Sequence, residues 1–168
     1  MKQDRSYEKI TLSDLRRLAK IAQEDREDLF NRKPLLRAYA ERIICVALCQ
    51  GAAVHFLDGK NGIKDFDVWT FYRELPSRPF PYRRNAHRDF GDPKFGTDTK
   101  KIDHAGRRVD LLGRSIPCKM GQGTIEAVQR YLSDSPNATP KLLSKKAIII
   151  IEPDALIGET AWPPTSIR

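Results

Sequence analysis

Hydrophobic and polar residues alternate with a helical period near the N-terminus. Residues 12–31 are predicted to form an amphipathic helix, because apolar side chains recur on one face and charged ones cover the other. Thr11, followed three positions later by Asp14, is typical of a helix start with a carboxylate in its first turn. The apolar positions are Leu15, Leu18, Ala22 and Leu29.

The next segments are shorter and less regular. A second helix is predicted over residues 34–43, because Pro34 suits the first turn of a helix. The apolar run 43–49 fits either the tail of that helix or a buried strand, and periodicity does not separate the two. Residues 52–57 predict a short helix, and the glycine-rich segment 58–62 predicts a loop.

Three segments have the composition of strands. Residues 63–72 give the clearest one, because they are rich in β-branched and aromatic side chains. Residues 108–112 predict a second strand. Residues 147–152 predict a third, which Pro153 ends.

The remaining segments are predicted to be one helix and several loops. Residues 124–133 read as a helix with Thr124 as its cap. The proline-containing segments 75–107 and 135–140, and the tail 162–164, are predicted to be irregular. A loop as long as the first of these is usually functional or mobile in a small domain.

Together these elements predict a single domain over residues 1–168 of the α/β (or α+β) class. We expect a small mixed sheet, with helices packed on one face and acidic residues on the other. Within it, residues 1–42 supply the N-terminal helices, 43–113 the central strands with their motifs, and 114–168 a C-terminal helix and strand.

Composition agrees with a soluble protein. Of the 168 residues, 40% are hydrophobic and 31% charged, and the longest apolar run, 147–151, is far too short to span a membrane. The charged N-terminus lacks the apolar core of an export signal. Three cysteines without a CxxC pair then predict reduced thiols in a cytoplasmic protein, with no membrane partner.

The charge balance favours a polyanionic partner. Thirty basic residues against 22 acidic ones give a net charge of +8, and residues 78–108 alone hold nine basic and four acidic residues. Arg83, Arg84 and Arg88 lie near the aromatic residues Tyr82 and Phe90, which suits phosphate contacts and base stacking, although an exposed loop has the same appearance. His87, in the same stretch, could contact phosphate but has no partners at metal-ligand spacing.

The acidic residues of the central strands carry the most specific chemistry. Side chains in a strand alternate between faces, so Asp65 and Asp67 share one face while Phe66 lies on the other. Two carboxylates about 7 Å apart repel each other and resist desolvation unless a cation lies between them. Asp110 lies in an apolar strand and joins the pair if the two strands are neighbours.

Three carboxylates in this arrangement suit a pair of divalent cations. Hard oxygen ligands favour Mg²⁺ or Mn²⁺ over zinc. A pair of such ions about 3.5–4 Å apart can activate an attacking hydroxyl and stabilise a leaving pyrophosphate. The alternative is a set of surface acids on an edge strand, and an Asp-x-Asp pair also occurs in sugar-nucleotide glycosyltransferases.

The combination of motifs resembles the nucleotidyltransferase superfamily, which shares the polymerase-β palm. Its members have a glycine-containing turn after a first strand, an Asp-x-Asp pair on the next strand, and a third acid on a later strand. The resemblance covers about residues 43–113. The matching positions are Gly51-Ala52-Ala53 for the turn, Asp65-Phe66-Asp67 for the pair and Asp110 for the third acid.

The turn departs from the family pattern. Glycine is usually followed there by glycine or serine, whose hydroxyl can contact a phosphate, whereas Ala52 and Ala53 have none. Backbone N–H groups at Gly51 and Ala52 can still receive a phosphate at the N-terminus of a helix. Lys64 either contacts a phosphate or is solvated. His55 either faces the nucleotide or is a structural histidine.

The resemblance implies transfer of a nucleoside monophosphate from an NTP to a hydroxyl or phosphate acceptor, with nucleic acid among the candidates. Asp65 and Asp67 would then hold both Mg²⁺ ions, and Asp110 would complete the site and help to deprotonate the acceptor. Two alternatives remain: a non-catalytic module of the same fold that binds nucleic acid, and a metal-dependent nuclease. The acceptor, the base of the NTP and the oligomeric state stay open.

Overall fold

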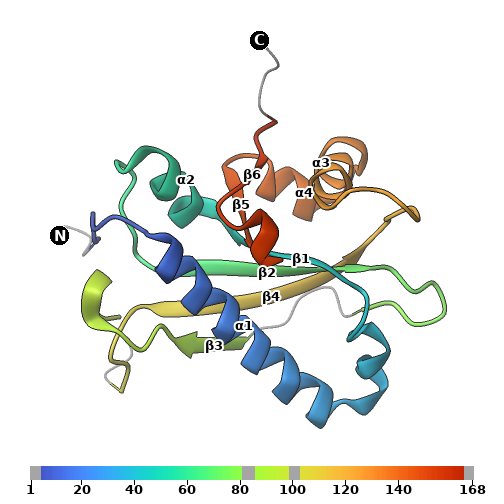
Figure 1. The fold of residues 1–168 in the computed structure, drawn as a ribbon, viewed down its shortest axis with the longest axis horizontal. Coiled ribbons are helices and arrows are strands. Elements are labelled where there is room, and N and C mark those ends of the chain that lie inside the picture. Colours follow the sequence, from blue (N-terminus) through green and yellow to red (C-terminus); the bar gives the residue numbers. More distant parts are fainter. Residues whose placement is uncertain (1–4, 81–85, 99–102, 165–168) are drawn as a thin grey trace.

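Six strands form one mixed sheet at the centre of the molecule (Figure 1). The computed structural model describes residues 5–80, 86–98 and 103–164. Strand order across the sheet is β3-β4-β2-β1-β5-β6, and β2 and β4 run parallel while the other neighbours are antiparallel. The strands are β1 (Ile43–Cys49), β2 (Phe66–Arg73), β3 (Ala86–Asp89), β4 (Arg108–Ile116), β5 (Ala147–Glu152) and β6 (Thr160–Trp162).

Four α-helices lie within the described residues, and short 3₁₀ turns connect several elements. The predicted α/β (α+β) class is therefore confirmed. None of these helices is long and apolar enough to cross a bilayer. The α-helices are α1 (Leu12–Arg32), α2 (Gln50–Asp58), α3 (Thr124–Asp134) and α4 (Ala138–Leu143), and the 3₁₀ helices are Pro34–Tyr39, Pro93–Phe95 and Asp154–Leu156.

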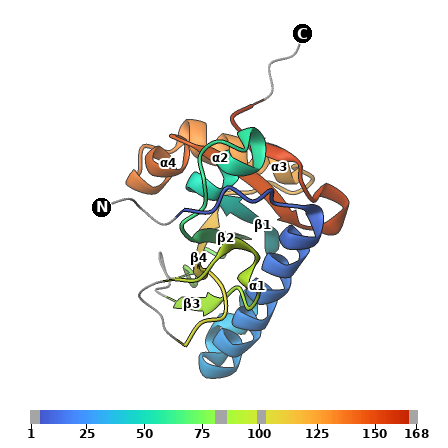
Figure 2. The same cartoon turned by 90° about the vertical axis from the view of Figure 1, so that its left-hand side faces the viewer.

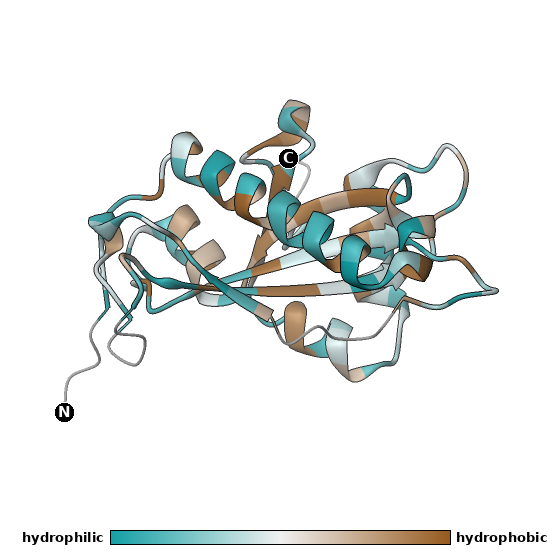
Figure 3. Ribbon diagram, turned by 90° about the horizontal axis from the view of Figure 1, so that it is seen from below, coloured by the Kyte–Doolittle hydropathy of each residue, from teal (hydrophilic) through white to brown (hydrophobic). Residues whose placement is uncertain are grey.

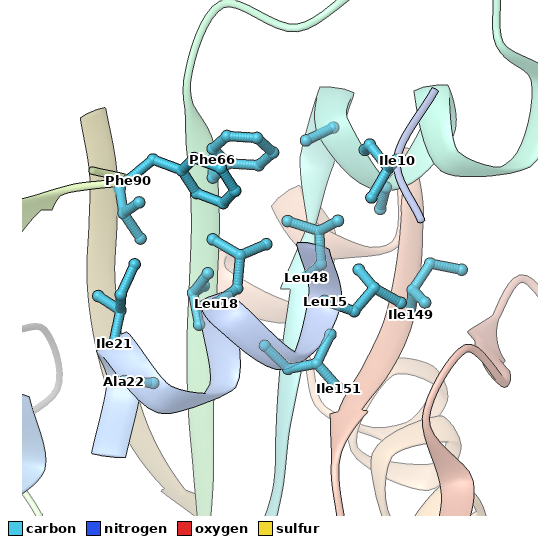
Figure 4. Close-up of a cluster of buried hydrophobic side chains, with 14 of the residues drawn as sticks. Ile10, Leu15, Leu18, Ile21, Ala22, Leu48, Phe66, Phe90, Ile149 and Ile151 are labelled. Carbon is cyan, nitrogen blue, oxygen red and sulfur yellow. The ribbon is translucent and has the colours of Figure 1, made fainter. Parts of the chain in front are cut away.

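Helix α1 covers one face of the sheet. It begins as predicted: the Thr11 hydroxyl accepts a hydrogen bond from the backbone N–H of Asp14, whose carboxylate in turn accepts from the Thr11 backbone. The apolar stripe of α1 packs on β1, β2, β4 and β5, as Leu18 and Phe66 show in Figure 4. Hydrophobic residues follow the strands, while the outer side of α1 is largely hydrophilic (Figure 3).

The opposite face is covered in part by α3 and α4. Val128 and Leu143 of these helices pack against Ala47 and Trp69 of the sheet. Figure 2 shows α1 and α4 on opposite sides of the strands. The expectation that all helices would pack on one face is therefore wrong, because the sheet is apolar on both faces along much of its length and each face needs a cover.

Element boundaries differ from the predictions mainly where local signals are weak. The run 43–49 is strand β1 and not a helix tail. Strand β3 lies inside the stretch predicted to be a loop, and its polar sequence forms an edge strand only through pairing with β4. Likewise α4 begins inside the loop predicted at 135–140, and β6 ends at Trp162, the first residue of the tail predicted to be irregular. Gly123 rather than Thr124 is the N-cap of α3.

Candidate metal centre

The β-sheet brings the three predicted aspartates together. Strand β2 lies beside β4 with Asp67 directly opposite Asp110, so the strand adjacency that the sequence argument required is confirmed. Asp65 lies one residue before β2, which starts at Phe66, so it precedes the regular strand. One carboxylate oxygen from each of the three aspartates lies within 4.8 Å of the others.

Alternation along β2 explains how one strand is apolar on one side and acidic on the other. Phe66 and Val68 point into the core beneath α1. Asp67 points to the opposite face, where Trp69 follows it into the cluster beneath α3 and α4. The acids therefore lie on the α3–α4 face, at the end of the sheet where β2 begins.

Repulsion and burial act on the same carboxyl group in this cluster. Burial raises the pKa of Asp110, and the nearby charge of Asp65 raises it further, although Arg108 and His87 oppose both effects. Because the side chain of Asp110 is only 25% exposed, water does not screen this repulsion fully. A divalent cation would relieve it, so the donor set of three hard carboxylate oxygens fits Mg²⁺ or Mn²⁺.

Arg108 is a basic residue beside the acids that the sequence motifs did not predict. Its guanidinium lies 3.3 Å from a carboxylate oxygen of Asp65 and 3.1 Å from one of Asp110. The signal was present, because Arg108 precedes Asp110 by two residues and a strand places such positions on one face. His87 of β3 also lies opposite Asp110, so the paired strands bring a histidine to the acids.

The end of β1 places the start of α2 beside the acids. Cys49, the last residue of β1, lies opposite Asp67, and α2 begins at the next residue. Burial and the charge of Asp67 raise the pKa of the Cys49 thiol, which stays protonated in the core. The first turn of α2 has no side-chain cap within the described residues, so its backbone N–H groups at Gly51 and Ala52 suit an anion.

Gly51 is required for a close approach and not for an unusual backbone angle. A Cβ at this position would lie 2.9 Å from the side-chain nitrogen of Asn61. That nitrogen donates a hydrogen bond to the Gly51 carbonyl, which ties the loop before Asp65 to the start of α2. The positive φ in this turn, +63°, falls on Gln50, the residue before.

A cleft of about 320 Å³ opens next to these groups. Asp65 and Asp67 form part of its wall together with the Gly51-Ala52 turn. Gln50 also lines it, and most of its other side chains are either basic or apolar. The cations are Arg5, Lys64 and Lys146, and the apolar residues are Trp69, Leu112 and Leu142.

A buried histidine secures this wall of the cleft. His55 accepts a hydrogen bond at Nδ1 from the Gly62 backbone N–H (3.0 Å), and its Nε2–H donates to the Glu8 carbonyl (2.9 Å). Ser6 and Ile63 exchange two backbone hydrogen bonds, so the N-terminal segment that carries Arg5 is tied to the same loop. Of the two readings of His55, the contacts support the structural one.

Only some of the residues predicted to bind phosphate lie at the cleft. Gly51, Ala52 and Lys64 lie at the cleft. Arg88 does not: its guanidinium pairs with Asp25 and Asp28 of α1 on the opposite face of the sheet. The sequence argument placed it in a loop, but β3 pairs with β4 and turns its alternate side chains toward α1. Arg83 and Arg84 lie outside the described residues.

Several residues of the cleft were missed from the sequence. The Ser6–Ile63 pairing brings Arg5 to the cleft, and the start of β5 brings Lys146 there. Both positions therefore depend on contacts between distant segments. Trp69 and Leu112 were visible as apolar strand residues, but nothing local shows that the cover of the sheet ends beside them.

Comparison with known proteins gives no relative for this arrangement. No protein-family model matches the chain, and neither a curated protein nor a solved structure matches it. The chemistry of the site must therefore be argued from its geometry.

Proposed function

We propose that the protein is a metal-dependent nucleotidyltransferase, which moves a nucleoside monophosphate from an NTP to a hydroxyl or phosphate acceptor. The observation that carries the proposal is the meeting of three carboxylates, from Asp65, Asp67 and Asp110, within 4.8 Å. They lie next to a cleft that also contains an uncapped helix start and three basic residues. An acidic metal cluster beside a phosphate-binding wall is what NTP chemistry needs.

Each group of residues has a role in the proposed reaction. Asp65, Asp67 and Asp110 would hold Mg²⁺, which when bound supplies a Lewis acid for the acceptor hydroxyl and for the triphosphate. The N–H groups of Gly51 and Ala52 orient phosphate oxygens by hydrogen bonds at the positive end of α2. The basic side chains of the cleft neutralise the triphosphate.

Asp110 would complete the metal site beside the acceptor, whose deprotonation a bound cation favours. Burial and the charge of Asp65 raise the pKa of Asp110 in the metal-free protein, and a cation at the site would oppose that shift. The apolar residues Trp69 and Leu112 keep water away from one side of the cleft, which strengthens the electrostatic contacts inside it.

The test is incubation with each labelled NTP, with Mg²⁺ or Mn²⁺, and with cellular RNA as acceptor. We expect pyrophosphate release and a labelled product, and Asp67→Asn should lower kcat/KM by at least about 100-fold. Asp154→Asn is the matched control, because this aspartate is highly exposed and pairs with Arg16 far from the cleft.

Other outcomes would identify the alternatives. Silence of the wild type with all four NTPs would overturn the proposal. RNA degradation that requires Asp67 would indicate a nuclease that uses the same acids. RNA binding that survives Asp67→Asn, with no turnover, would indicate a non-catalytic binding module.

A further inference from the structure

Arg108 occupies a position in the acidic cluster close to where a metal ion would bind. Its side chain reaches Asp65 at 3.3 Å and Asp110 at 3.1 Å, and it is itself only 31% exposed. The strand period fixes it on the same face as Asp110, so it cannot turn to the α1 side without breaking β4. The guanidinium therefore contacts two of the three carboxylates and offsets part of the repulsion between them.

A guanidinium and a divalent cation would be stabilised by the negative charge of the same three carboxylates. Arg108 contacts one oxygen of Asp65 and one of Asp110. Oxygens of all three acids lie within 4.8 Å of one another, so an ion held by all three would lie close to the guanidinium. Two positive charges that close repel strongly in a half-buried site, which sets the two cations in competition.

We propose that Arg108 is a built-in counter-ion of the free site, and that a divalent cation must displace it from Asp65 and Asp110 to bind. The inference rests on the proposed function only in taking the three aspartates as a metal site. Asp65 lines the cleft, so a displaced guanidinium stays within reach of an anion bound there. Metal binding would thus supply the cleft with a further phosphate contact.

The test is Mn²⁺ binding by the full-length protein, measured by calorimetry and by the electron paramagnetic resonance signal of free Mn²⁺. Arg108→Gln should bind Mn²⁺ roughly tenfold more tightly than the wild type, because loss of two partly buried ion pairs removes the competitor. Arg108→Lys, a point charge that cannot span both carboxylates, should fall between them.

Arg114→Gln is the matched control. Arg114 lies on the same strand and the same face, but it donates to Thr139 and stacks on Tyr131, away from the acids. Its loss should leave Mn²⁺ affinity within about twofold of the wild type, the change expected of a distant charge. Tighter binding by both variants would mean that net charge, not displacement, sets the affinity, and would overturn the proposal.

Thermal unfolding provides an independent readout. Without metal, Arg108→Gln should melt below the wild type, because the acids lose their counter-ion; with saturating Mn²⁺ it should show the larger rise in Tm. Equal or weaker Mn²⁺ binding by Arg108→Gln, or no binding by either protein, overturns the proposal. If Arg108→Gln binds Mn²⁺ more tightly as expected but the wild type transfers no nucleotide, only the proposed function is overturned.

Discussion

At the residue scale, Asp110 shows how the clustering of three carboxylates costs stability. A raised pKa means that the folded state disfavours the charged carboxylate, so at neutral pH Asp110 opposes folding. Burial is the first cause, and the charge of Asp65 adds to it despite the ion pair with Arg108. Residues kept at such a cost are typical of binding and catalytic sites.

Asp110→Asn should therefore stabilise the metal-free protein at pH 7, by about 0.5–1 kcal/mol, the range of a relieved half-buried repulsion. The sign follows from linkage. The wild type loses its penalty as the pH falls through the raised pKa of Asp110, so the advantage of the variant should shrink in acid. Urea unfolding at several pH values with EDTA present measures this, and a variant less stable than the wild type at pH 7 would contradict it.

Local periodicity accounts for what the sequence could reveal about single residues. Asp65, Asp67 and Asp110 could be identified because an acid inside an apolar strand is conspicuous, and Arg108 could have been found by the same period. Arg88 could not be placed, because its face depends on β3, which has no local signal. Its ion pair with Asp25 joins residues far apart in the chain, and no local pattern predicts such a contact.

At the element scale, the connection between β1 and α2 is strained where α2 begins to line the cleft. Gln50 has a φ of +63°, the left-handed region that side chains rarely adopt. Its neighbours explain why the backbone is held there: Cys49 completes the β1 pairing, and the Gly51 carbonyl accepts from Asn61. The surrounding contacts maintain the strain, as is common at binding sites.

Gln50→Gly should relieve this strain. Glycine adopts positive φ without steric cost but loses more entropy on folding, so we expect a net gain of about 0.5 kcal/mol in the free energy of unfolding. Equilibrium urea denaturation with an unchanged m-value is the measurement. Gly51→Ala is the contrasting variant: it should lose stability, because its Cβ would meet Asn61 at 2.9 Å.

The start of α1 gives a second prediction at this scale. Burial of Asp14 opposes its ionisation, but hydrogen bonds from Lys94 and Thr11 outweigh it and hold its pKa below the ordinary value. Asp14→Asn should cost about 1–2 kcal/mol at pH 7, since it removes the ion pair with Lys94 and weakens the hydrogen bonds that the carboxylate accepts from Thr11. Ser13→Ala, an exposed neighbour, is the control.

The pH dependence of that variant has the opposite sign to that of Asp110→Asn. A lowered pKa stabilises the folded state above the ordinary aspartate pKa, and this contribution is lost as the pH falls through the lowered folded-state value. The difference between wild type and Asp14→Asn should therefore narrow below about pH 4. A difference that stays constant down to pH 2 would show that the carboxylate charge is not involved.

At the scale of the whole molecule, long-range pairing decides what the sequence leaves open. Helix α1 was predictable from its periodicity, and strands β2 and β5 from their β-branched and aromatic residues. Strands β3 and β6 are short edge strands that form only against a neighbour. The cleft follows the same rule. Its acids come from predictable strands, but Arg5 and Lys146 reach it through the tertiary fold.

The net charge of +8 does not show which basic side chains are accessible, because the fold decides where each one lies. The basic residues of the stretch 78–108 that the structure describes are largely turned inward or engaged by the protein itself. Arg107 is buried and donates to the Phe95 carbonyl, and Lys94 pairs with Asp14. Arg88 is held by two acids of α1. Charge counted along the sequence therefore overstates the cations that this stretch presents to a polyanion.

Substitutions of Lys64 and Arg88 can test whether the cleft is where a polyanion binds. Each substitution removes one positive charge from the protein, but only Lys64 lies at the cleft. If single-stranded RNA or a triphosphate binds there, Lys64→Gln should weaken binding and lower the slope of log affinity against log salt by about 0.7 for RNA, one phosphate contact. Arg88→Gln should leave that slope unchanged and instead reduce the free energy of unfolding, because the buried carboxylate of Asp25 loses its ion pair with Arg88. Fluorescence anisotropy across a salt series separates the two. Equal slope changes would mean that the polyanion contacts both faces, so that the cleft is not the binding site.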